Sequence, residues 1–507
     1  MPAHLTGADQ WGTIIATVDP LRVSPTMSAI TLFASLLRCQ DRDWFGRHLL
    51  HRFATLTFFL GTAICAESWH SAAHSAENVT RPNVVFILAD DLGYGDLGCF
   101  GQKLIETPHI DRLAVQGTRF TQAYAGATVC APSRCSLMTG RHNGHAAIRG
   151  NQEVQPEGQY PMPADTFTVA HLMQKAGYAT GLIGKWGLGH PGSSSTPDKM
   201  GFDYFFGYNC QRKAHEYFPE YLWRNSEQVP LGGKQYSHDL LAEDALQFVR
   251  RNKDKPFFLY LALTIPHAKL QVPDLGPYAA KDWPENLKTL AAMITRMDRD
   301  VGRLMALLVE LSLDERTLVF FASDNGAAYR DDLFDHSGPL RGYKRDMYEG
   351  GIRTPAIVRW PGKVKAGAVS EQVWSFPDFL PTLADLTSQP IPAGLDGISI
   401  LPTLVQGETI EHPPLYYEFH ERGFQQAARL GHWKGVKLAP DRLLELYDLT
   451  TDIGEKHNVA TEHPEIASKI ESYLKTARTD SQQWTIQKAM AKGTKKGKAK
   501  AKGAGNE

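Results

Sequence analysis

Residues 83–91 read Asn-Val-Val-Phe-Ile-Leu-Ala-Asp-Asp, an unbroken apolar run that ends in two adjacent carboxylates. A continuous run rich in β-branched residues is typical of a strand buried on both faces, as in a parallel sheet. Similar apolar runs recur at 179–183, 256–265 and 317–322, with helical patterns between them at 166–176, 237–251 and 287–311. Strands that alternate with helices predict an α/β fold with a large, mainly parallel sheet sandwiched by helices.

Each apolar run leads into a charged or coordinating side chain. In chain order these are Asp90 with Asp91, Lys185, His267, and Asp324 with Asn325. In open α/β sheets, ligand sites collect at the carboxyl ends of the strands. We therefore expect these side chains to converge on one site.

The two acidic pairs give three carboxylates and one amide oxygen. Hard oxygen ligands favour Ca²⁺ or Mg²⁺ over zinc. Because neighbouring residues of a strand point to opposite faces, Asp90 and Asp91 can share an ion only where the chain leaves strand geometry. The glycines that follow, Gly93 and Gly95, permit such a turn. The alternative is that each pair merely caps a turn, a common use of Asp and Asn.

The motif at residues 130–134 reads Cys-Ala-Pro-Ser-Arg. Pro132 suits the first turn of a helix, which would place Cys130 just ahead of a helix N-terminus. Free N–H groups and the helix dipole favour an anion there. Taken alone, Cys130 could equally be a small buried side chain or a disulfide partner of Cys135.

A smaller unit is expected after the Pro- and Gly-rich segment 377–402. Short strand patterns at 414–419, 427–430, 433–437 and 443–448 precede a helical pattern at 462–477. They predict a C-terminal α+β subdomain with an antiparallel sheet. We expect a leader at 1–80, a catalytic domain at 81–400, the C-terminal subdomain at 401–484 and a disordered Lys/Ala/Gly tail at 485–507.

Composition places the chain among globular enzymes, at 42% hydrophobic and 21% charged residues. A net charge of -1 argues against nucleic-acid binding through bulk charge. No internal run predicts a stable membrane span, and six cysteines in 507 residues do not form a disulfide framework. A basic segment at 47–52 followed by an apolar run at 53–65 predicts a secretory signal, hence export to the periplasm or exterior. The alternative for that run is a short buried helix.

Over residues 82–480 the chain resembles the formylglycine-dependent sulfatases, the arylsulfatase-like members of the alkaline phosphatase superfamily. The resemblance is carried, in chain order, by Asp90-Asp91, 130–134, Gly184-Lys185-Trp186, Asp324-Asn325-Gly326, 342–355 and 445–449. It implies a mixed sheet between helices and a four-stranded antiparallel sheet near the C-terminus. It also implies an arylsulfatase-type sulfuric ester hydrolase that acts on sulfate monoesters of carbohydrates and on small aryl sulfates.

The resemblance further implies that a maturation enzyme oxidises Cys130 to formylglycine. The hydrated aldehyde, a gem-diol, would attack sulfur and form a covalent sulfo-enzyme intermediate. Arg134 would orient the diol, Lys185 and Lys344 would hold sulfate, and His267 would protonate or stabilise the leaving alcohol. Calcium is preferred to magnesium, with ligands from Asp90, Asp91, modified Cys130, Asp324 and Asn325.

Substrate contacts are less well defined by the sequence. Candidate side chains are His142, His145, His190, Arg212 and His215. The last two lie in a polar and aromatic stretch, 209–217, that could bind a sugar or be an ordinary surface loop. Many relatives have histidine two residues after the lysine of Gly-Lys-Trp, whereas this chain has Gly187, and His190 is a candidate replacement.

Two rival functions share this scaffold. A phosphomonoesterase or phosphodiesterase would use Ser or Thr and two zinc ions held by several histidines, unlike the oxygen ligands found here. A non-catalytic relative that binds sulfated glycans would have a broken ligand set, whereas this set is whole apart from Gly187.

Overall fold

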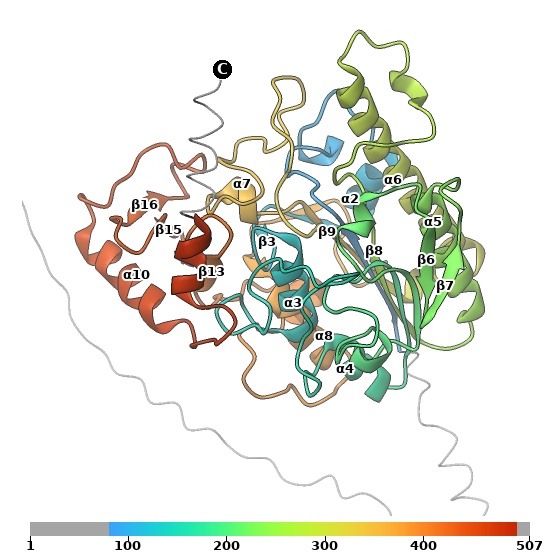
Figure 1. Cartoon of the computed structure of the whole chain (residues 1–507), viewed down its shortest axis with the longest axis horizontal. Coiled ribbons are helices and arrows are strands. Elements are labelled where there is room, and N and C mark those ends of the chain that lie inside the picture. Colours follow the sequence, from blue (N-terminus) through green and yellow to red (C-terminus); the bar gives the residue numbers. More distant parts are fainter. Residues whose placement is uncertain (1–80, 494–507) are drawn as a thin grey trace, which may run out of the picture. The chain divides into compact units, whose positions relative to one another are not determined.

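The structure, a computed structural model, describes residues 81–493, so the predicted leader at 1–80 and residues 494–507 lie outside the described residues. A ten-stranded mixed sheet runs through the centre of this part of the chain (Figure 1). Its strands follow the order β11 (Ala368–Ser370), β2 (Thr118–Phe120), β10 (Ala356–Arg359), β9 (Thr317–Ser323), β1 (Asn83–Ala89), β8 (Phe257–Ala262), β4 (Ala179–Lys185), β5 (Tyr204–Tyr208), β6 (Tyr221–Arg224) and β7 (Glu227–Pro230).

The middle of the sheet is parallel. Strands β9, β1, β8, β4 and β5 pair in parallel, with Val84 opposite both Leu318 and Phe258. Antiparallel pairs join β10 to β9 and β2 on one side, and β6 to β5 and β7 on the other. The carboxyl ends of the parallel strands therefore meet at one edge, which is where the site lies.

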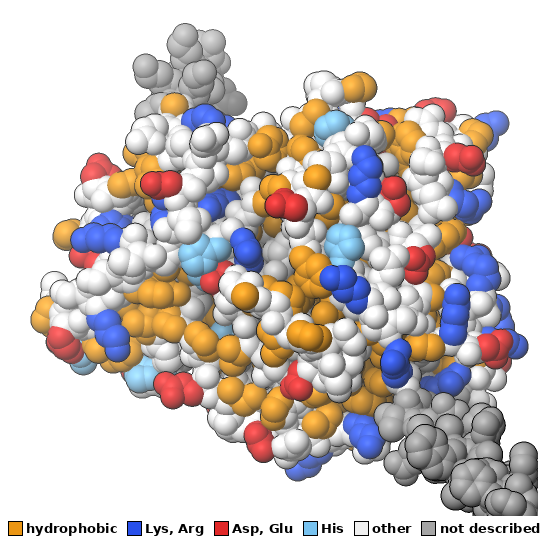
Figure 2. Space-filling model, turned by 90° about the horizontal axis from the view of Figure 1, so that it is seen from below, with side chains coloured by type: hydrophobic (Ala, Val, Ile, Leu, Met, Phe, Trp, Pro, Cys, Tyr) orange, Lys and Arg blue, Asp and Glu red, His pale blue; other side chains and the backbone are white. Residues whose placement is uncertain are grey.

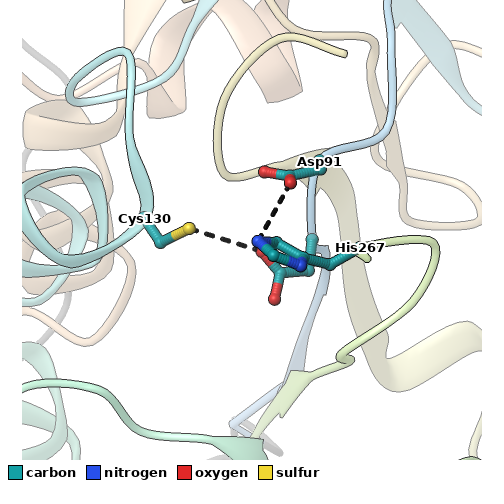
Figure 3. Close-up of side chains that lie close together, drawn as sticks. Asp91, Cys130 and His267 are labelled. Carbon is teal, nitrogen blue, oxygen red and sulfur yellow. Dashed lines mark hydrogen bonds and ion pairs between the residues drawn. The ribbon is translucent and has the colours of Figure 1, made fainter. Parts of the chain in front are cut away.

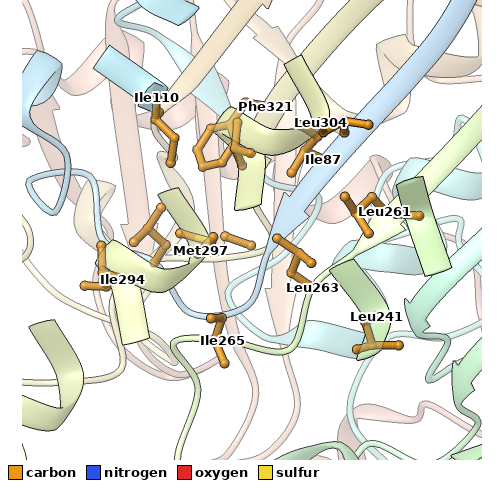
Figure 4. Packing of buried hydrophobic residues seen from close by; sticks show 14 of the residues in the cluster. Ile87, Ile110, Leu241, Leu261, Leu263, Ile265, Ile294, Met297, Leu304 and Phe321 are labelled. Atoms are coloured by element: carbon orange, nitrogen blue, oxygen red, sulfur yellow. The ribbon is translucent and has the colours of Figure 1, made fainter. Parts of the chain in front are cut away.

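Helices cover both faces of the sheet. One face carries α2 (Pro108–Gln116), α5 (Ser237–Arg251) and α6 (Glu285–Glu310), and the other carries α3 (Cys130–Thr139), α4 (Val169–Lys175), α8 (Phe379–Leu386) and α9 (Leu401–Gln406). Alternate residues of β1 enter the two cores, with Ile87 on the first face and Phe86 on the second. Figure 4 shows the first core, where Ile87 and Leu261 of the sheet pack near Met297 of α6.

The central strands coincide with the apolar runs in the sequence, and the mixed, mainly parallel sheet between helices confirms the predicted fold class. Strands β2, β10 and β11 were not predicted. They are only three or four residues long, which is too short for a readable pattern. Within residues 81–493, no helix is both long and apolar enough for a membrane crossing.

A second, four-stranded antiparallel sheet follows. It consists of β13 (Leu415–Phe419), β14 (Gln425–Leu430), β15 (Trp433–Lys437) and β16 (Glu445–Asp448), and α10 (Pro464–Thr476) packs on one face through Ile470 and Leu474. The other face shares a core with Tyr124, Val129 and Ile352. Three further small elements are β3 (Ala123–Tyr124), α7 (Glu349–Ile352) and β12 (Trp374–Ser375). The predicted antiparallel sheet is present, and the domain boundary at 400 stays a prediction.

The predicted disordered tail begins too early. Residues 486–493 are helical, although we expected disorder from 485. Trp484 is buried and donates a hydrogen bond from Nε1 to Ala147 O at 2.9 Å, and Ala489 is also buried. The buried side chains of Trp484 and Ala489 hold this segment against the protein. The Lys-rich composition of the segment concealed this feature.

Candidate active site at the carboxyl edge of the sheet

The end of β1 turns so that both of its carboxylates serve one site. Asp91 has a φ of 67°, which takes it out of strand geometry and cancels the alternation of side chains. Its backbone N–H donates to Asp324 Oδ1, at the end of β9, at 3.2 Å. Asp90, Asp91 and Asp324 are all buried. The three acids thus form one cluster, as the sequence predicted.

Two lysines neutralise the first acidic pair. Lys185 Nζ, at the end of β4, lies 2.6 Å from Asp90 Oδ2, and Lys344 Nζ donates to both Asp91 oxygens at 2.6 Å. Burial alone would raise the pKa of Asp90, but the positive charges around it, Lys185 first, lower that pKa to about 2. The pKa of Asp91 is lowered as well, because His267 and Lys344 outweigh burial. Both carboxylates are therefore ionised at neutral pH.

Arg134 joins three elements beneath the site. Its Nε and Nη2 donate to Asp324 Oδ2 at 3.1 and 2.8 Å, and Nη1 donates to Lys185 O at 3.1 Å. Nη2 also lies 3.7 Å from Asp90 Oδ1. The guanidinium is fully buried, so it fixes α3 against the ends of β4 and β9.

Cys130 is the first residue of α3, whereas the sequence placed it just ahead of the helix. The helix thus begins earlier than expected, with Val129 at the N-cap position. Its Sγ lies 3.6 Å from Asp90 Oδ1 and 3.4 Å from Lys344 Nζ. Figure 3 shows the thiol and the His267 ring pointing toward one another across the site. Burial raises the pKa of the Cys130 thiol to about 12, despite the two lysines. An unmodified thiol here is protonated and is a poor nucleophile. It forms no disulfide with Cys135, since both are free.

His267 faces the acidic cluster from the segment after β8. Its Nε2 lies 3.2 Å from Asp91 Oδ2, and its Nδ1 lies 2.5 Å from Ala268 O. Tyr217 donates its hydroxyl to His267 O at 2.6 Å and fixes the backbone there. Burial lowers the pKa of His267, although Asp91 opposes this effect. A lowered pKa makes its imidazolium form a stronger acid.

The donor set fits a hard divalent cation. Asn325 Nδ2 donates to Asp91 Oδ1 at 2.7 Å and to Gly326 O at 2.9 Å, which leaves Oδ1 facing inward. That oxygen is buried and has no hydrogen-bond partner within residues 81–493. A buried acceptor without a donor is costly in a protein interior, and a cation would satisfy it. Ligand atoms of Asp90, Asp91, Cys130 and His267 also lie within 4.8 Å of one another.

The weaker substrate candidates separate into two groups. His142 and His145 stack on each other, and the His145 Nδ1 lies 2.8 Å from Asp396 Oδ1; no hydrogen bond or ion pair within the described chain links these histidines to the acidic cluster. His190 Nδ1 lies 3.1 Å from Pro191 O and is not brought to the cluster either. By contrast, Arg212 and His215 both line one open pocket.

Two further residues line this pocket: Asn151, which we did not predict, and Gln211, which lies in the stretch 209–217 that could bind a sugar. Asn151 accepts a hydrogen bond at Oδ1 from Ala131 N, at 3.1 Å, and so contacts the first turn of α3. Gln211 occupies the space beside Gly187, where an added Cβ would lie 2.9 Å from Gln211 Cγ. Asn151 neither follows an apolar run nor carries a charge, so the sequence held no signal for it.

Comparison with known proteins gives a consistent result along the chain. Residues 82–389 match the family described as Sulfatase, and residues 342–481 match the family described as N-sulphoglucosamine sulphohydrolase, C-terminal. The chain is 35% identical to human N-acetylgalactosamine-6-sulfatase over 367 residues, which cover 66% of this chain and 68% of that protein. It is 30% identical to the N-acetylgalactosamine-6-O-sulfatase of Bacteroides thetaiotaomicron over 493 residues, covering 80% and 94% of the two chains.

A solved structure is similar over the same extent. The crystal structure of Ps i-CgsB in complex with k-i-k-neocarrahexaose superimposes with a TM-score of 0.73 at 30% identity. The match covers 80% of this chain and 94% of that one. The similarity therefore includes both the large sheet and the C-terminal sheet.

Proposed function

The chain belongs to the sulfatase family, and from this premise we propose that it hydrolyses sulfate monoesters of a sulfated carbohydrate, with small aryl sulfates as further substrates. The observation that carries the proposal is the position of Cys130. It begins α3, lies 3.4 Å from Lys344 Nζ and 3.6 Å from Asp90 Oδ1, and is buried among charged groups. The relatives named for N-acetylgalactosamine sulfate and the neocarrahexaose in the similar structure support a carbohydrate substrate.

We infer that a maturation enzyme converts Cys130 to formylglycine before the protein is active. Burial, which raises the pKa of the thiol, supports this, because a protonated cysteine is a poor nucleophile. Formylglycine would supply a hydrated aldehyde as the nucleophile.

We further infer that Ca²⁺, rather than Mg²⁺, is the cofactor. Asp90, Asp91, Asp324, Asn325 and the modified residue 130 would hold it. A divalent ion there would supply positive charge to the sulfate oxygens and to the nucleophile. The unpaired oxygen of Asn325 supports an oxygen-coordinated cation. Among residues 81–493, the group of possible metal ligands at this site contains a single histidine, which disfavours a two-zinc site.

The side chains around residue 130 have distinct tasks in this proposal. Lys185 and Lys344 stabilise charge on the sulfate oxygens, because their ammonium groups border the thiol and its acidic neighbours. Arg134 holds α3 in register with the acids. The departing oxygen takes the electron pair of the broken S–O bond, and His267 delivers a proton to this oxygen.

We also propose that the protein acts outside the cytoplasm, in the periplasm or beyond. The signal-like pattern at 47–65 supports export but lies outside the described residues.

The decisive experiment compares sulfate and phosphate esters. The protein is co-expressed with a formylglycine-generating enzyme and supplied with 4-nitrophenyl sulfate, a 6-O-sulfated N-acetylhexosamine and 4-nitrophenyl phosphate. We expect inorganic sulfate from the first two, measured by ion chromatography, and a loss of about 10³-fold or more in Cys130→Ala. Faster release of phosphate than of sulfate would support the phosphatase rival. Binding of sulfated sugars without turnover would support the non-catalytic one.

A further inference from the structure

His215 is a second histidine beside the active site, and the reaction outlined above does not use it. It ends a short 3-10 turn, Lys213–His215, beyond β5. Its ring stacks on His267 with centroids 3.6 Å apart and planes inclined by only 11°. His267 in turn contacts Asp91. The two imidazoles therefore form a continuous wall next to the acidic cluster.

The Nε2 atom of His215 lacks a partner. It is shielded from solvent, yet it makes no hydrogen bond within residues 81–493. Most buried polar atoms in proteins are paired, and each exception calls for an explanation. Here the ring also lines the open pocket beside the cluster. His215 therefore keeps a free hydrogen-bonding position next to the pocket, at a nitrogen that solvent does not reach.

The charges nearby keep this imidazole neutral. Burial lowers the pKa of His215 far below its usual value, and Lys185 and His267 lower it further. A neutral imidazole carries one N–H donor and cannot repel the lysines that hold sulfate. It is therefore suited to donating a hydrogen bond to an oxygen atom that is becoming negative.

Other side chains that could take this place are directed elsewhere. Gly187 has no side chain, and Gln211 fills the space next to it. The His190 ring lies against Pro191 O, at 3.1 Å. Among the described histidines, His267 contacts the acidic cluster and His215 stacks on His267.

We propose that His215 is a catalytic residue whose Nε2–H donates a hydrogen bond to the bridging oxygen of the sulfate ester. When the bond between sulfur and this oxygen breaks, its electron pair goes to the oxygen. The N–H of His215 stabilises that charge, and the proton that completes the alcohol comes from His267. This inference rests on the proposed sulfatase activity and adds a residue that decides which leaving groups the enzyme accepts.

The inference has a characteristic kinetic consequence. A weakly acidic alcohol, such as a sugar hydroxyl, develops more charge on leaving than an acidic phenol does, and so depends more on a donor. A residue that contacts only a non-bridging sulfate oxygen would affect all esters alike, and a residue that only supports His267 by packing would not regain activity when it is replaced by a smaller side chain with an N–H donor.

The test measures kcat/KM for aryl sulfates with phenols of decreasing acidity and for a 6-O-sulfated N-acetylhexosamine. In His215→Ala we expect a loss of no more than about tenfold with 4-nitrophenyl sulfate and of about 10²-fold to 10³-fold with the sugar sulfate. His215→Asn, which retains an N–H donor, should recover part of the activity on the sugar. His457→Ala, at a side chain that is 81% exposed, is the control and should match the wild type throughout.

Circular dichroism and thermal melting check that each variant is folded. An equal loss across all leaving groups, or no loss, would overturn the assignment of His215. These results differ from failure of the proposed function itself, in which the wild-type, formylglycine-containing protein would release no sulfate from any ester.

Discussion

The amide of Asn325 distinguishes a cation site from a set of buried ion pairs. Its Nδ2 is paired with Asp91 and Gly326 O, but its Oδ1 is not paired within the described chain. If the cluster served only to pair acids with lysines, this oxygen would be buried with no group to bind. A calcium ligand explains it, since Ca²⁺ accepts amide and carboxylate oxygens together.

Replacing this amide should weaken calcium binding. For Asn325→Ala we expect the dissociation constant for Ca²⁺, measured by isothermal titration calorimetry, to rise by at least about tenfold. Asp282→Asn, at an exposed acid outside the site, controls for loose binding to surface carboxylates and should leave the constant unchanged. Equal affinities in Asn325→Ala and the wild type would argue against a calcium site here.

The sequence revealed those site residues that directly follow long strands. Asp90, Asp91 and Asp324 could be predicted because each follows an apolar run that the structure shows as a central strand. The contact between Cys130 and Lys344 could not be found in this way, because 214 positions separate them. Only the motif in which each occurs indicated a shared site. His215 was a candidate, but its stacking on His267 depends on how a loop folds.

The loop that follows β1 is fixed by a buried charged group. His336 lies between two acids: its Nδ1 contacts Asp96 in this loop, and its Nε2 lies 2.7 Å from Asp331 Oδ2. His336 O also accepts a hydrogen bond from Gly95 N at 2.7 Å. Burial disfavours the imidazolium, but Asp96 and Asp331 outweigh it and raise the pKa of His336 to about 9. The charged ring thus holds the segment next to Asp91 in place.

This arrangement predicts a loss of stability in alkaline solution. The pKa of His336 is higher in the folded than in the unfolded protein, so its contribution is complete below pH about 6.5 and disappears as pH rises through about 9. The wild type should lose roughly 3 kcal/mol of unfolding free energy from this group across that interval. Urea unfolding at several pH values, compared between the wild type and His336→Gln, isolates the effect. If the difference in unfolding free energy between the two proteins stayed constant across this pH interval, a charged His336 between Asp96 and Asp331 would be contradicted.

Secondary structure was most predictable where one pattern was long. Strand β1, helix α5 and strand β15 have the bounds that the apolar patterns indicated. The short edge strands of the large sheet were missed because three or four residues show no period. The start of α3 at Cys130 differs by one position, because Val129 has no capping side chain that would reveal the helix end.

The C-terminal sheet is joined to the rest of the described chain by buried charges. Lys434 Nζ, on β15, lies 2.8 Å from Glu349 Oε1 of α7 and 3.3 Å from Glu455 Oε1. All three side chains are fully buried. Tyr124 donates its hydroxyl to Glu349 at 2.6 Å and also belongs to the apolar core that the C-terminal sheet shares with Val129 and Ile352. Val129 lies in that same core, directly before Cys130.

We therefore expect the two sheets to unfold together. Lys434→Met leaves buried Glu455 without its cation and removes one of the two cations of Glu349, the other being Arg353, and should cost about 3–5 kcal/mol. Calorimetry should show a single transition in the wild type and in the variant, at a lower temperature in the variant. Lys437 lies on the same strand as Lys434 and pairs with Glu471 at a partly exposed position. Lys437→Met should therefore cost no more than about 1 kcal/mol. Separate melting of the C-terminal sheet, or equal effects of the two substitutions, would contradict a shared core.

The order of strands and helices was sufficient to predict the architecture, but not how its parts join. The shared core of Tyr124, Val129 and the C-terminal strands involves residues nearly 300 positions apart, which one sequence does not connect. On the exposed face in Figure 2, Lys and Arg side chains are interspersed with Asp and Glu, in keeping with the near-zero net charge. The helix at 486–493 was hidden by its lysines.

The central claim is that residue 130 works as an aldehyde, and peptide mass spectrometry tests it most directly. Protein co-expressed with a maturation enzyme is digested, and the fraction of the residue 130 peptide in which the thiol has become an aldehyde is measured across preparations of different specific activity. The account predicts that sulfatase activity rises in proportion to the aldehyde fraction and is absent from protein that carries only the thiol. Full activity in protein whose residue 130 is entirely cysteine would contradict it.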